Sequence, residues 1–268
     1  MAAVIDLREP QEVIDLREPT TTTTTTTVSL TVVMPVYNEE ATVEEAVRAV
    51  LAVDLPCEAH LVVVDDGSTD ATPDILAALE ATLADPRLVV LRHQRNAGKG
   101  AALRTGAAAA STTHVVPFDA DLEYDPEDLA RLLVPVLAGE ADIVYGTRRQ
   151  RRGVPHGSRL YAVGNALMTL AANALYDSRI TDLHTCLKLV PLDLFRQLPL
   201  LEEGFGLDTE LTAWLLRTGA PVWEVPVSYR SRSRVEGKKI CWRDSIVCFH
   251  LLYLIRRERP PAVPVGGA

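Results

Sequence analysis

Three carboxylates at regular spacing, Asp119, Asp121 and Glu123, form the segment of this sequence that is best suited to chemistry. Carboxylate oxygens at positions i, i+2 and i+4 are hard ligands of the kind that Mg²⁺ or Mn²⁺ takes together with phosphate oxygens. A cation held there would neutralise charge on a departing diphosphate. The same residues also fit a solvated turn that caps the helix expected from Pro126. Because the apolar segment 114–117 leads directly into the carboxylates, we favour the metal site.

Two further segments have the composition of nucleotide contacts. Asp66 follows an apolar stretch, where a carboxylate can accept hydrogen bonds from a base or a ribose. Asp65 and Asp66 also fit an Asx turn before the next helix, and we expect Asp66 to bind ligand and Asp70 to be structural. Lys99 lies between two glycines at the start of a helix, which indicates an anion contact. A solvated lysine is an equally good interpretation, and the absence of GxxxxGK[ST] excludes a P-loop.

A basic run and a mixed polar segment occur in the second half of the sequence. The arginines of 148–152 interrupt an acidic protein and fit a phosphate-binding loop, a membrane-facing loop or a solvated loop. In 181–190, alternation predicts one strand face carrying Asp182, His184, Cys186 and Lys188. No third group is placed to orient a Cys/His pair, so a thiol enzyme is disfavoured. We expect His184 to be packed or hydrogen-bonded.

Apolar segments alternate with segments of helical periodicity from residue 28 onward. Continuous apolar strands separated by helices predict an α/β fold with a mostly parallel central sheet and helices on both faces. Ligands bind beyond the carboxyl ends of such strands, so we expect the polar side chains there to share one rim. The expected strands are 28–34, 60–64, 88–92, 114–117 and 141–145, and the expected helices are 39–53, 72–83, 98–110 and 126–138.

Composition narrows the classes of protein. The chain has 268 residues and a net charge of −9, which argues against nucleic-acid binding. Its four cysteines form no CxxC pair, so we expect reduced thiols in a cytoplasmic protein. No apolar run reaches the roughly 20 residues of a spanning helix. The repeated VIDLREP and the threonine tract predict a disordered tail over 1–27, followed by one domain over 28–257 and a flexible tail over 258–268.

Together these motifs resemble the family 2 glycosyltransferases with a GT-A fold, and among them the dolichyl- and polyprenyl-phosphate mannosyl- and glucosyltransferases. The resemblance covers about 28–255. Each motif is modest alone, whereas their order and spacing are specific. The matching segments are MPVYNEE (34–40), VDDGSTD (64–70), NAGKGA (96–101), DADLE (119–123), YGTR (145–148), DLHTC (182–186) and EGKKI (236–240).

The resemblance implies an inverting, metal-dependent transfer of a hexose, mannose or glucose. The donor would be a nucleoside diphosphate sugar such as GDP-mannose or UDP-glucose, the acceptor a polyprenyl or dolichyl phosphate, and the cofactor Mg²⁺ or Mn²⁺. Glu123 stands where many relatives carry Gln. The implied roles are the nucleoside pocket for Pro35, Tyr37, Glu39 and Asp66, the diphosphate and metal for Asp119, Asp121 and Glu123, the donor or acceptor phosphate for Arg148 and Arg159, and the acceptor side for Asp182.

The chemistry of the acceptor decides which side chains are needed. A phosphate monoester is largely ionised at pH 7 and needs cations, for which Arg148, Arg159 and Lys188 are candidates. A sugar hydroxyl would need a base, and Asp182 is the candidate. We expect Asp121, Arg148 and Asp182 to take part in catalysis. A transferase with a saccharide or small-molecule hydroxyl acceptor and a sugar nucleotidyltransferase remain as alternatives.

The segment 242–257 is mostly apolar, with flanking Trp and Arg. This composition suits a helix that lies at a membrane interface or docks on a membrane protein. It suits a core-packed final helix equally well. Many bacterial relatives continue into two membrane-spanning helices, and no such segment is expected here.

Overall fold

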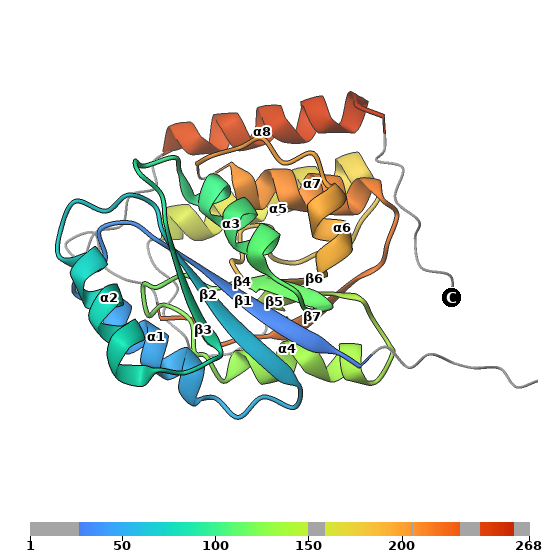
Figure 1. Cartoon of the computed structure of the whole chain (residues 1–268). Helices are drawn as coiled ribbons and strands as arrows, with labels where there is room; N and C mark the ends of the chain where they lie inside the picture. Colours follow the sequence, from blue (N-terminus) through green and yellow to red (C-terminus); the bar gives the residue numbers. More distant parts are fainter. Residues whose placement is uncertain (1–26, 150–158, 205, 231–241, 260–268) are drawn as a thin grey trace, which may run out of the picture.

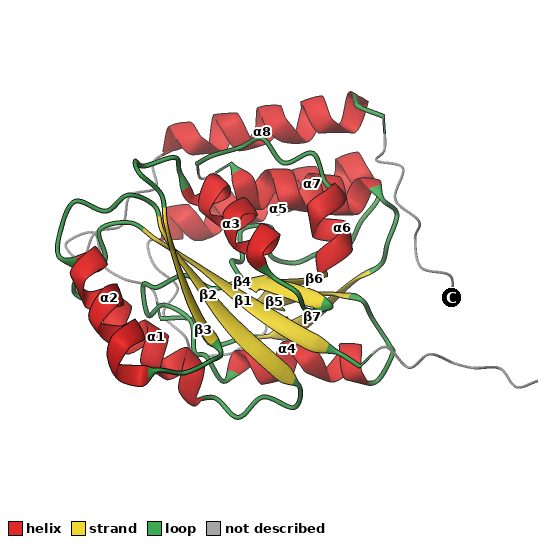
Figure 2. Ribbon diagram, viewed as in Figure 1, coloured by secondary structure: helices red, strands yellow, loops and turns green. Residues whose placement is uncertain are grey.

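A mostly parallel sheet forms the centre of the protein (Figures 1 and 2). The computed structural model describes residues 27–149, 159–204, 206–230 and 242–259. Within these ranges seven strands pair in the order β3-β2-β1-β4-β6-β5-β7, and only β6 runs antiparallel to its neighbours. The strands are β1 (Ser29–Val36), β2 (Glu58–Asp65), β3 (Leu88–Arg92), β4 (His114–Pro117), β5 (Ile143–Thr147), β6 (Lys188–Pro191) and β7 (Val222–Pro226).

Helices cover both faces of this sheet, so the predicted α/β architecture is confirmed. Two separate apolar cores result, one under each helical layer. Helix α8 lies outermost and packs on α5 and α7 (Figure 1). One face carries α1 (Val43–Ala52), α2 (Thr72–Leu83) and α4 (Asp128–Leu137); the other carries α3 (Lys99–Ala109), α5 (Arg159–Tyr176), α6 (Leu192–Gln197), α7 (Leu207–Arg217) and α8 (Trp242–Arg257).

The sequence pattern placed most of these elements to within a few residues. The bounds of α2, β3 and β4 agree with the prediction. The helix expected from residue 39 begins only at Val43, because the preceding residues form a turn in which the carbonyl of Glu39 accepts from the N–H groups of Thr42 and Val43. The VIDLREP repeat, the threonine tract up to residue 26 and the EGKKI motif lie outside the described residues.

The prediction of a strand through 181–190 was wrong for most of that segment. Only 188–191 pair as β6, and the preceding residues are irregular. Alternation therefore does not place the four polar side chains on one face. His184 and Cys186 line a cavity, whereas Asp182 and Lys188 do not.

Among the described residues, none of the helices combines the length and the apolar character that crossing a bilayer requires.

Candidate active site

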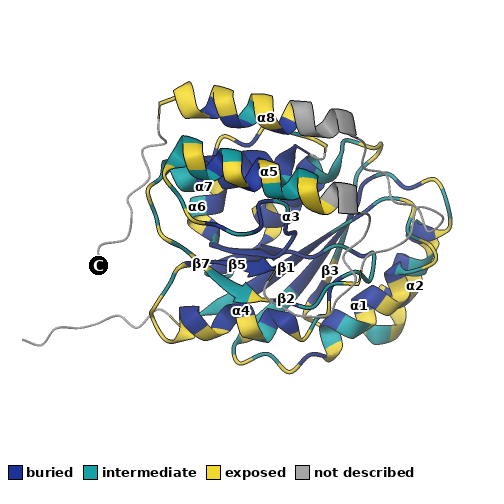
Figure 3. Ribbon diagram, turned by 180° about the vertical axis from the view of Figure 1, so that it is seen from behind, coloured by how far each residue is buried: buried dark blue, intermediate teal, exposed yellow. Residues whose placement is uncertain are grey.

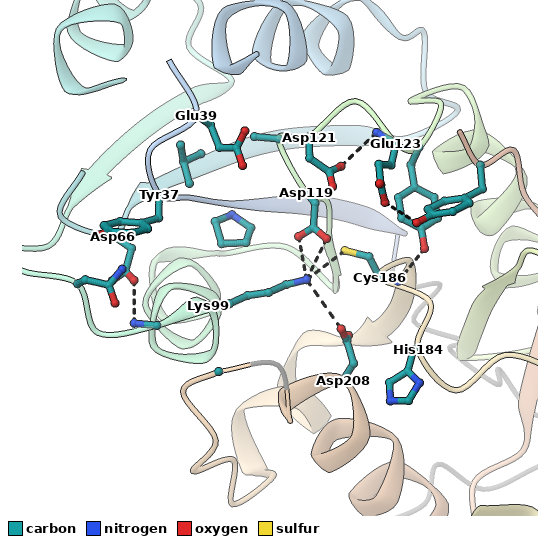
Figure 4. Close-up of a pocket in the computed structure, with 18 of the residues that line it drawn as sticks. Tyr37, Glu39, Asp66, Lys99, Asp119, Asp121, Glu123, His184, Cys186 and Asp208 are labelled. Carbon is teal, nitrogen blue, oxygen red and sulfur yellow. Dashed lines mark hydrogen bonds and ion pairs between the residues drawn. The ribbon is translucent and has the colours of Figure 1, made fainter. Parts of the chain in front are cut away.

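A cavity of about 400 Å³ opens beyond the carboxyl ends of the parallel strands (Figure 4). This volume is in the range of small-molecule sites. The segments that follow β1, β2, β3 and β4 all contribute to its wall, so the predicted shared rim is confirmed. Among the predicted site residues, those that line it are Pro35, Tyr37, Glu39, Asp66, Lys99, Asp119, Asp121, Glu123 and Arg148.

Lys99 lies at the centre of the cavity, at the first residue of α3. Its Nζ is 2.8 Å from Oδ1 of Asp119 and 3.8 Å from Oδ2 of Asp208 (Figure 4). Burial alone would lower the pKa of Lys99, but these carboxylates raise it well above its ordinary value. The lysine is therefore a fixed positive charge next to a predicted metal ligand. Together with the partial positive charge at the N-terminus of α3, the Lys99 ammonium makes this part of the cavity suitable for an anion.

Asp121 and Glu123 follow Asp119 in a tight turn just after strand β4. The N–H of Glu123 donates to Oδ1 of Asp121 at 3.1 Å, and Leu122 between them has φ +59°. A left-handed backbone at a leucine costs about 1 kcal/mol, and such conformations concentrate at functional sites. The carboxylate of Glu123 accepts a hydrogen bond from the hydroxyl of Tyr229. Glu123 is thus held by a neighbouring side chain at the edge of the cavity.

Asp66 is buried and anchors the loop that leads into α3. Its Oδ1 accepts from the N–H of Ala97 at 2.9 Å, and its Oδ2 accepts from the N–H of Gly98 at 2.7 Å. His93 Nδ1 is a further 2.7 Å partner of Oδ1. Besides lining the cavity, Asp66 therefore sets the position of Lys99. Asp70, predicted to be structural, accepts from the N–H groups of Thr72 and Glu40.

Arg148 lines the cavity just after β5 and is paired with Asp182. Nε and Nη2 of Arg148 donate to the two carboxylate oxygens, each at 2.7 Å. Burial by itself would raise the pKa of Asp182, but the charge and hydrogen bonds of Arg148 lower it to about 2. Because Asp182 is fully buried and committed to Arg148, its geometry suits a group that orients the guanidinium better than a base.

Tyr229 links Glu123 to Arg148 in the wall of the cavity. Its hydroxyl donates to Glu123, and the guanidinium of Arg148 lies 4.9 Å from its ring centre. Its ring meets that of Tyr124 edge to face, with centroids 5.2 Å apart. A cation over an aromatic face is attracted by the ring quadrupole. Tyr229 therefore contacts both the carboxylate edge and the arginine.

Cys186 and His184 have side chains that take part in catalysis in other enzymes, but here both are held in unreactive states. Burial raises the pKa of the Cys186 thiol well above its ordinary value, and a protonated thiol is a poor nucleophile. His184 has a partner at each ring nitrogen: Asn165 Oδ1 at 2.9 Å and Thr209 Oγ1 at 3.1 Å. The prediction of a packed, hydrogen-bonded histidine is confirmed.

We expect His184 to stay neutral throughout the physiological range. Burial lowers its pKa to about 4, so protonation is disfavoured in the folded state. Any stability that depends on neutral His184 is complete above the ordinary value of about 6.5 and is lost as the pH falls towards 4. Its imidazole C–H resonance, assigned by comparison with His184→Asn, should not move between pH 8 and 5.5. An inflection near pH 6.5 would contradict this.

A glycine pair lets the segment 202–203 close over the start of α3. A Cβ on Gly100 would lie 1.9 Å from the carbonyl oxygen of Glu202, and Gly98 has φ +92°. We expect Gly100→Ala to lower the free energy of unfolding by about 2 kcal/mol, because backbone atoms must move apart. Gly164→Ala is the matched control: it meets nothing within 4 Å, and in a helix it should stabilise by about 0.5–1 kcal/mol. Urea denaturation measures both, and equal effects would contradict the steric argument.

Not all predicted residues meet in the cavity. Lys188 is fully buried, and its Nζ donates to Asp208 Oδ1 at 3.0 Å and to the carbonyl of Thr185. This geometry does not favour the predicted phosphate contact, because the Lys188 ammonium is bound to the Asp208 carboxylate and does not line the cavity. The side chains of Arg151, Arg152 and Arg159 lie outside the described residues.

Two functional candidates were missed from the sequence. Asp208 lines the cavity from α7; burial would raise its pKa, but Lys188 and Lys99 lower it to about 2. Tyr229 is the other. Tyr229 lies three residues after β7, a strand outside the predicted set, and Asp208 lies on α7, far along the chain from the predicted strands.

Asp119 and Asp121 form a donor set that fits a divalent cation only together with substrate oxygens. Among the described residues, no three His, Cys, Asp or Glu side chains converge to hold a metal ion by themselves. Mg²⁺ is typically bound through one or two carboxylates plus substrate phosphates. Two carboxylates beside an anion-binding helix start match that pattern. The residues present therefore fit the cation that the motif implies.

Comparison with known proteins identifies the family. The sequence model described as glycosyl transferase family 2 matches residues 31–198, more than half of the chain. The chain belongs to glycosyl transferase family 2. It is 30% identical over 212 residues to the low-salt glycan biosynthesis hexosyltransferase Agl6 of Haloferax volcanii. The aligned region covers 76% of this chain and 48% of that protein. It is 27% identical to the dodecaprenyl-phosphate galacturonate synthase of Rhizobium johnstonii, over 88% of this chain and 69% of that one.

Solved structures agree on the fold of this family 2 glycosyltransferase. Glucosyl-3-phosphoglycerate synthase from Mycobacterium tuberculosis, in complex with Mn²⁺, UDP and phosphoglyceric acid, superposes with a TM-score of 0.65. The identity is 22%, and the match covers 88% of this chain and 80% of that one. The predicted GT-A fold is thereby confirmed. The chain spans about half the length of the Haloferax hexosyltransferase.

Proposed function

We propose that this glycosyltransferase moves a hexose, mannose or glucose, from a nucleoside diphosphate sugar to a polyprenyl phosphate, with inversion at the anomeric carbon. The observation that carries the proposal is a single cavity lined by the carboxylates of Asp119 and Asp121, the ammonium of Lys99 and the guanidinium of Arg148. A donor diphosphate would bind beside Lys99 and the two aspartates, and an acceptor phosphate would bind beside Arg148, at the proposed acceptor end. Relatives named for transfer to dodecaprenyl and undecaprenyl phosphate support this acceptor class.

The residues that line the cavity would have distinct tasks. Pro35, Tyr37, Glu39 and Asp66 would enclose the nucleoside, with Lys99 near the diphosphate. Asp119 and Asp121 would hold Mg²⁺ or Mn²⁺, which supplies Lewis-acid stabilisation of the leaving diphosphate when bound. Glu123, held by Tyr229, fixes the edge of the turn. Arg148, oriented by Asp182, would hold the acceptor phosphate close to the anomeric carbon, so that positioning replaces deprotonation.

The state of Asp182 favours the phosphate acceptor over a sugar hydroxyl. A hydroxyl acceptor needs a base with access to substrate. Asp182 is fully buried, does not line the cavity, and has its pKa lowered to about 2. An ionised phosphate needs no such base. A saccharide or small-molecule hydroxyl acceptor is therefore the second candidate, and a sugar nucleotidyltransferase the third.

A panel of donors and acceptors tests the proposal. Purified protein is incubated with GDP-mannose, UDP-glucose or UDP-galacturonate, with Mn²⁺ or with EDTA, and with either farnesyl phosphate or farnesol. We expect glycosyl transfer and release of nucleoside diphosphate from at least one donor, only with metal and only with the phosphate acceptor. Transfer to the hydroxyl of farnesol but not to farnesyl phosphate would overturn the phosphate acceptor, and release of pyrophosphate would indicate a nucleotidyltransferase.

A further inference from the structure

The exposed face of α5 is apolar, and the polar side chains of this helix point into the protein. Every exposed side chain described on this helix between residues 162 and 174 is apolar, including Val163, Leu167 and Leu170 at 55%, 60% and 64% exposure. Asn165 and Asn173 instead hydrogen-bond inward, to Asp182 and to the carbonyl of Ile180. A helix that borders water has the opposite arrangement. This inverted pattern indicates that something other than water covers α5.

The neighbouring helix α8 extends the same surface. The two helices are tied together by Tyr176, whose hydroxyl donates to the carbonyl of Leu252 at 2.7 Å, and by Arg256, whose Nε donates to the carbonyl of Leu175 at 2.7 Å. Figure 3 shows exposed residues on both helices from the same side. We call the set the α5–α8 apolar surface; it comprises Val163, Leu167 and Leu170 of α5 with Phe249 and Tyr253 of α8.

The charges beside this surface are of one predominant sign. The described parts of the two helices and their C-terminal flanks, 162–180 and 247–259, contain four arginines and two acidic residues, all exposed. That local excess occurs in a chain whose net charge is −9. Aromatic and aliphatic side chains next to arginines are the composition of helices that lie in a lipid interface. The residues concerned are Arg179, Arg256, Arg257 and Arg259, with Asp177 and Glu258.

Helix α5 connects this surface to the cavity. On its inner side, Asn165 donates to Asp182 at 2.8 Å and contacts His184 at 2.9 Å; Asp182 in turn holds Arg148. On its outer side, Val163 and Leu167 lie one turn or less away from Asn165. The wall of the proposed acceptor end and the apolar surface are therefore opposite faces of the same two helical turns.

We infer that the α5–α8 apolar surface docks on an anionic lipid bilayer, and that this contact brings the acceptor end of the cavity to the membrane. This inference rests on the proposed function, because a polyprenyl phosphate resides in a bilayer. A second copy of the chain fits less well. Two-fold pairing through this surface would bring the same arginine-bearing edges towards each other.

Vesicle co-sedimentation tests the inference on the full chain. The probe is vesicles of equal parts phosphatidylglycerol and phosphatidylcholine, compared with phosphatidylcholine alone. We expect the wild type to bind the anionic vesicles, and Leu167→Glu and Leu170→Glu to weaken that binding at least about tenfold, since each replaces an exposed leucine that would insert into the bilayer with a negative charge. Val134→Glu is the matched control: Val134 is 61% exposed on α4, on the other face of the sheet, and its binding should stay within about twofold.

Two acceptors separate this inference from the proposed function. With water-soluble farnesyl phosphate, Leu167→Glu should transfer sugar at the wild-type rate, whereas with undecaprenyl phosphate in vesicles it should lose about tenfold, matching its binding loss. Vesicle binding that Leu167→Glu leaves unchanged would overturn the docking surface. The docking surface would also be overturned if the wild type were a dimer in sedimentation velocity and Leu167→Glu dissociated that dimer. Surface-dependent binding without transfer to either phosphate would support docking and overturn the acceptor instead.

Discussion

Asp121→Asn is expected to lower kcat/KM about 10³-fold while the protein stays folded. The substitution keeps an oxygen that can accept from the N–H of Glu123, so the turn after β4 should persist. It removes the charge that, with Asp119, would hold the cation and neutralise the leaving diphosphate. Losing one preorganised electrostatic contact typically costs about 10²–10³ in rate, and loss of the metal adds to this.

Asp125→Asn is the control for that experiment. Asp125 lies four residues away and is exposed, does not line the cavity, and accepts from the N–H of Glu127, which asparagine can also do. Its activity should equal that of the wild type. Donor binding is followed by thermal shift with UDP-glucose or GDP-mannose: Asp121→Asn should lose the metal-dependent part of the shift. A variant that retains that part would remove the carboxylate from the metal assignment.

Removal of the Arg148 side chain is expected to be the most damaging single change to stability outside the apolar cores. Arg148→Ala leaves the fully buried Asp182 carboxylate without its guanidinium partner. Breaking a buried pair in this way typically costs about 3–5 kcal/mol. Arg48→Ala provides the contrast, because Arg48 and Glu44 form an exposed pair on α1 worth about 0.5 kcal/mol or less. Urea denaturation at pH 7 gives both values, and a similar small loss for the two variants would contradict the structural role of Arg148.

The pH dependence of stability reports on the same pair. The folded-state pKa of Asp182 is about 2, below its ordinary value of 3.8. A lowered carboxylate pKa stabilises the fold above the ordinary value, and this contribution is lost as the pH falls from about 4 towards 2. It amounts to about 2 kcal/mol. In Asp182→Asn this part of the acid dependence should be absent, which denaturation at pH 5 and pH 3 measures. An identical acid slope in both proteins would argue against it.

Local sequence pattern was sufficient for the elements up to β5 and for the cavity residues that lie at and after the ends of β1, β2 and β4. The strands β3 and β4 and the helix α2 follow from apolar periodicity, because each buries a regular face. The carboxylates after β4 could be predicted because parallel strands bring their carboxyl ends to one edge of the sheet. Asp119, Asp121, Tyr37 and Asp66 meet for that reason. The roles of these residues in binding metal and nucleotide stay predictions, as does the domain boundary at residue 28.

Other features depend on contacts between segments far apart in the chain. Sequence spacing suggested that Asp182 and Lys188 share a face and contact substrate, yet the chain before β6 is irregular, and the two pair with Arg148 and Asp208 instead. Tyr229 reaches Glu123 from 106 residues away. No local pattern encodes such partners.

The order of motifs along the chain thus determined the family, the parallel sheet and the edge at which the cavity opens, since these depend on strand direction and on short-range periodicity. Tertiary packing alone decided which charges neutralise one another, that His184 and Cys186 are held in uncharged states, and that α5 turns its asparagines inward and its leucines outward. Burial and charge pairing are properties of the assembled layers, because each requires knowing what lies on the other side of a side chain.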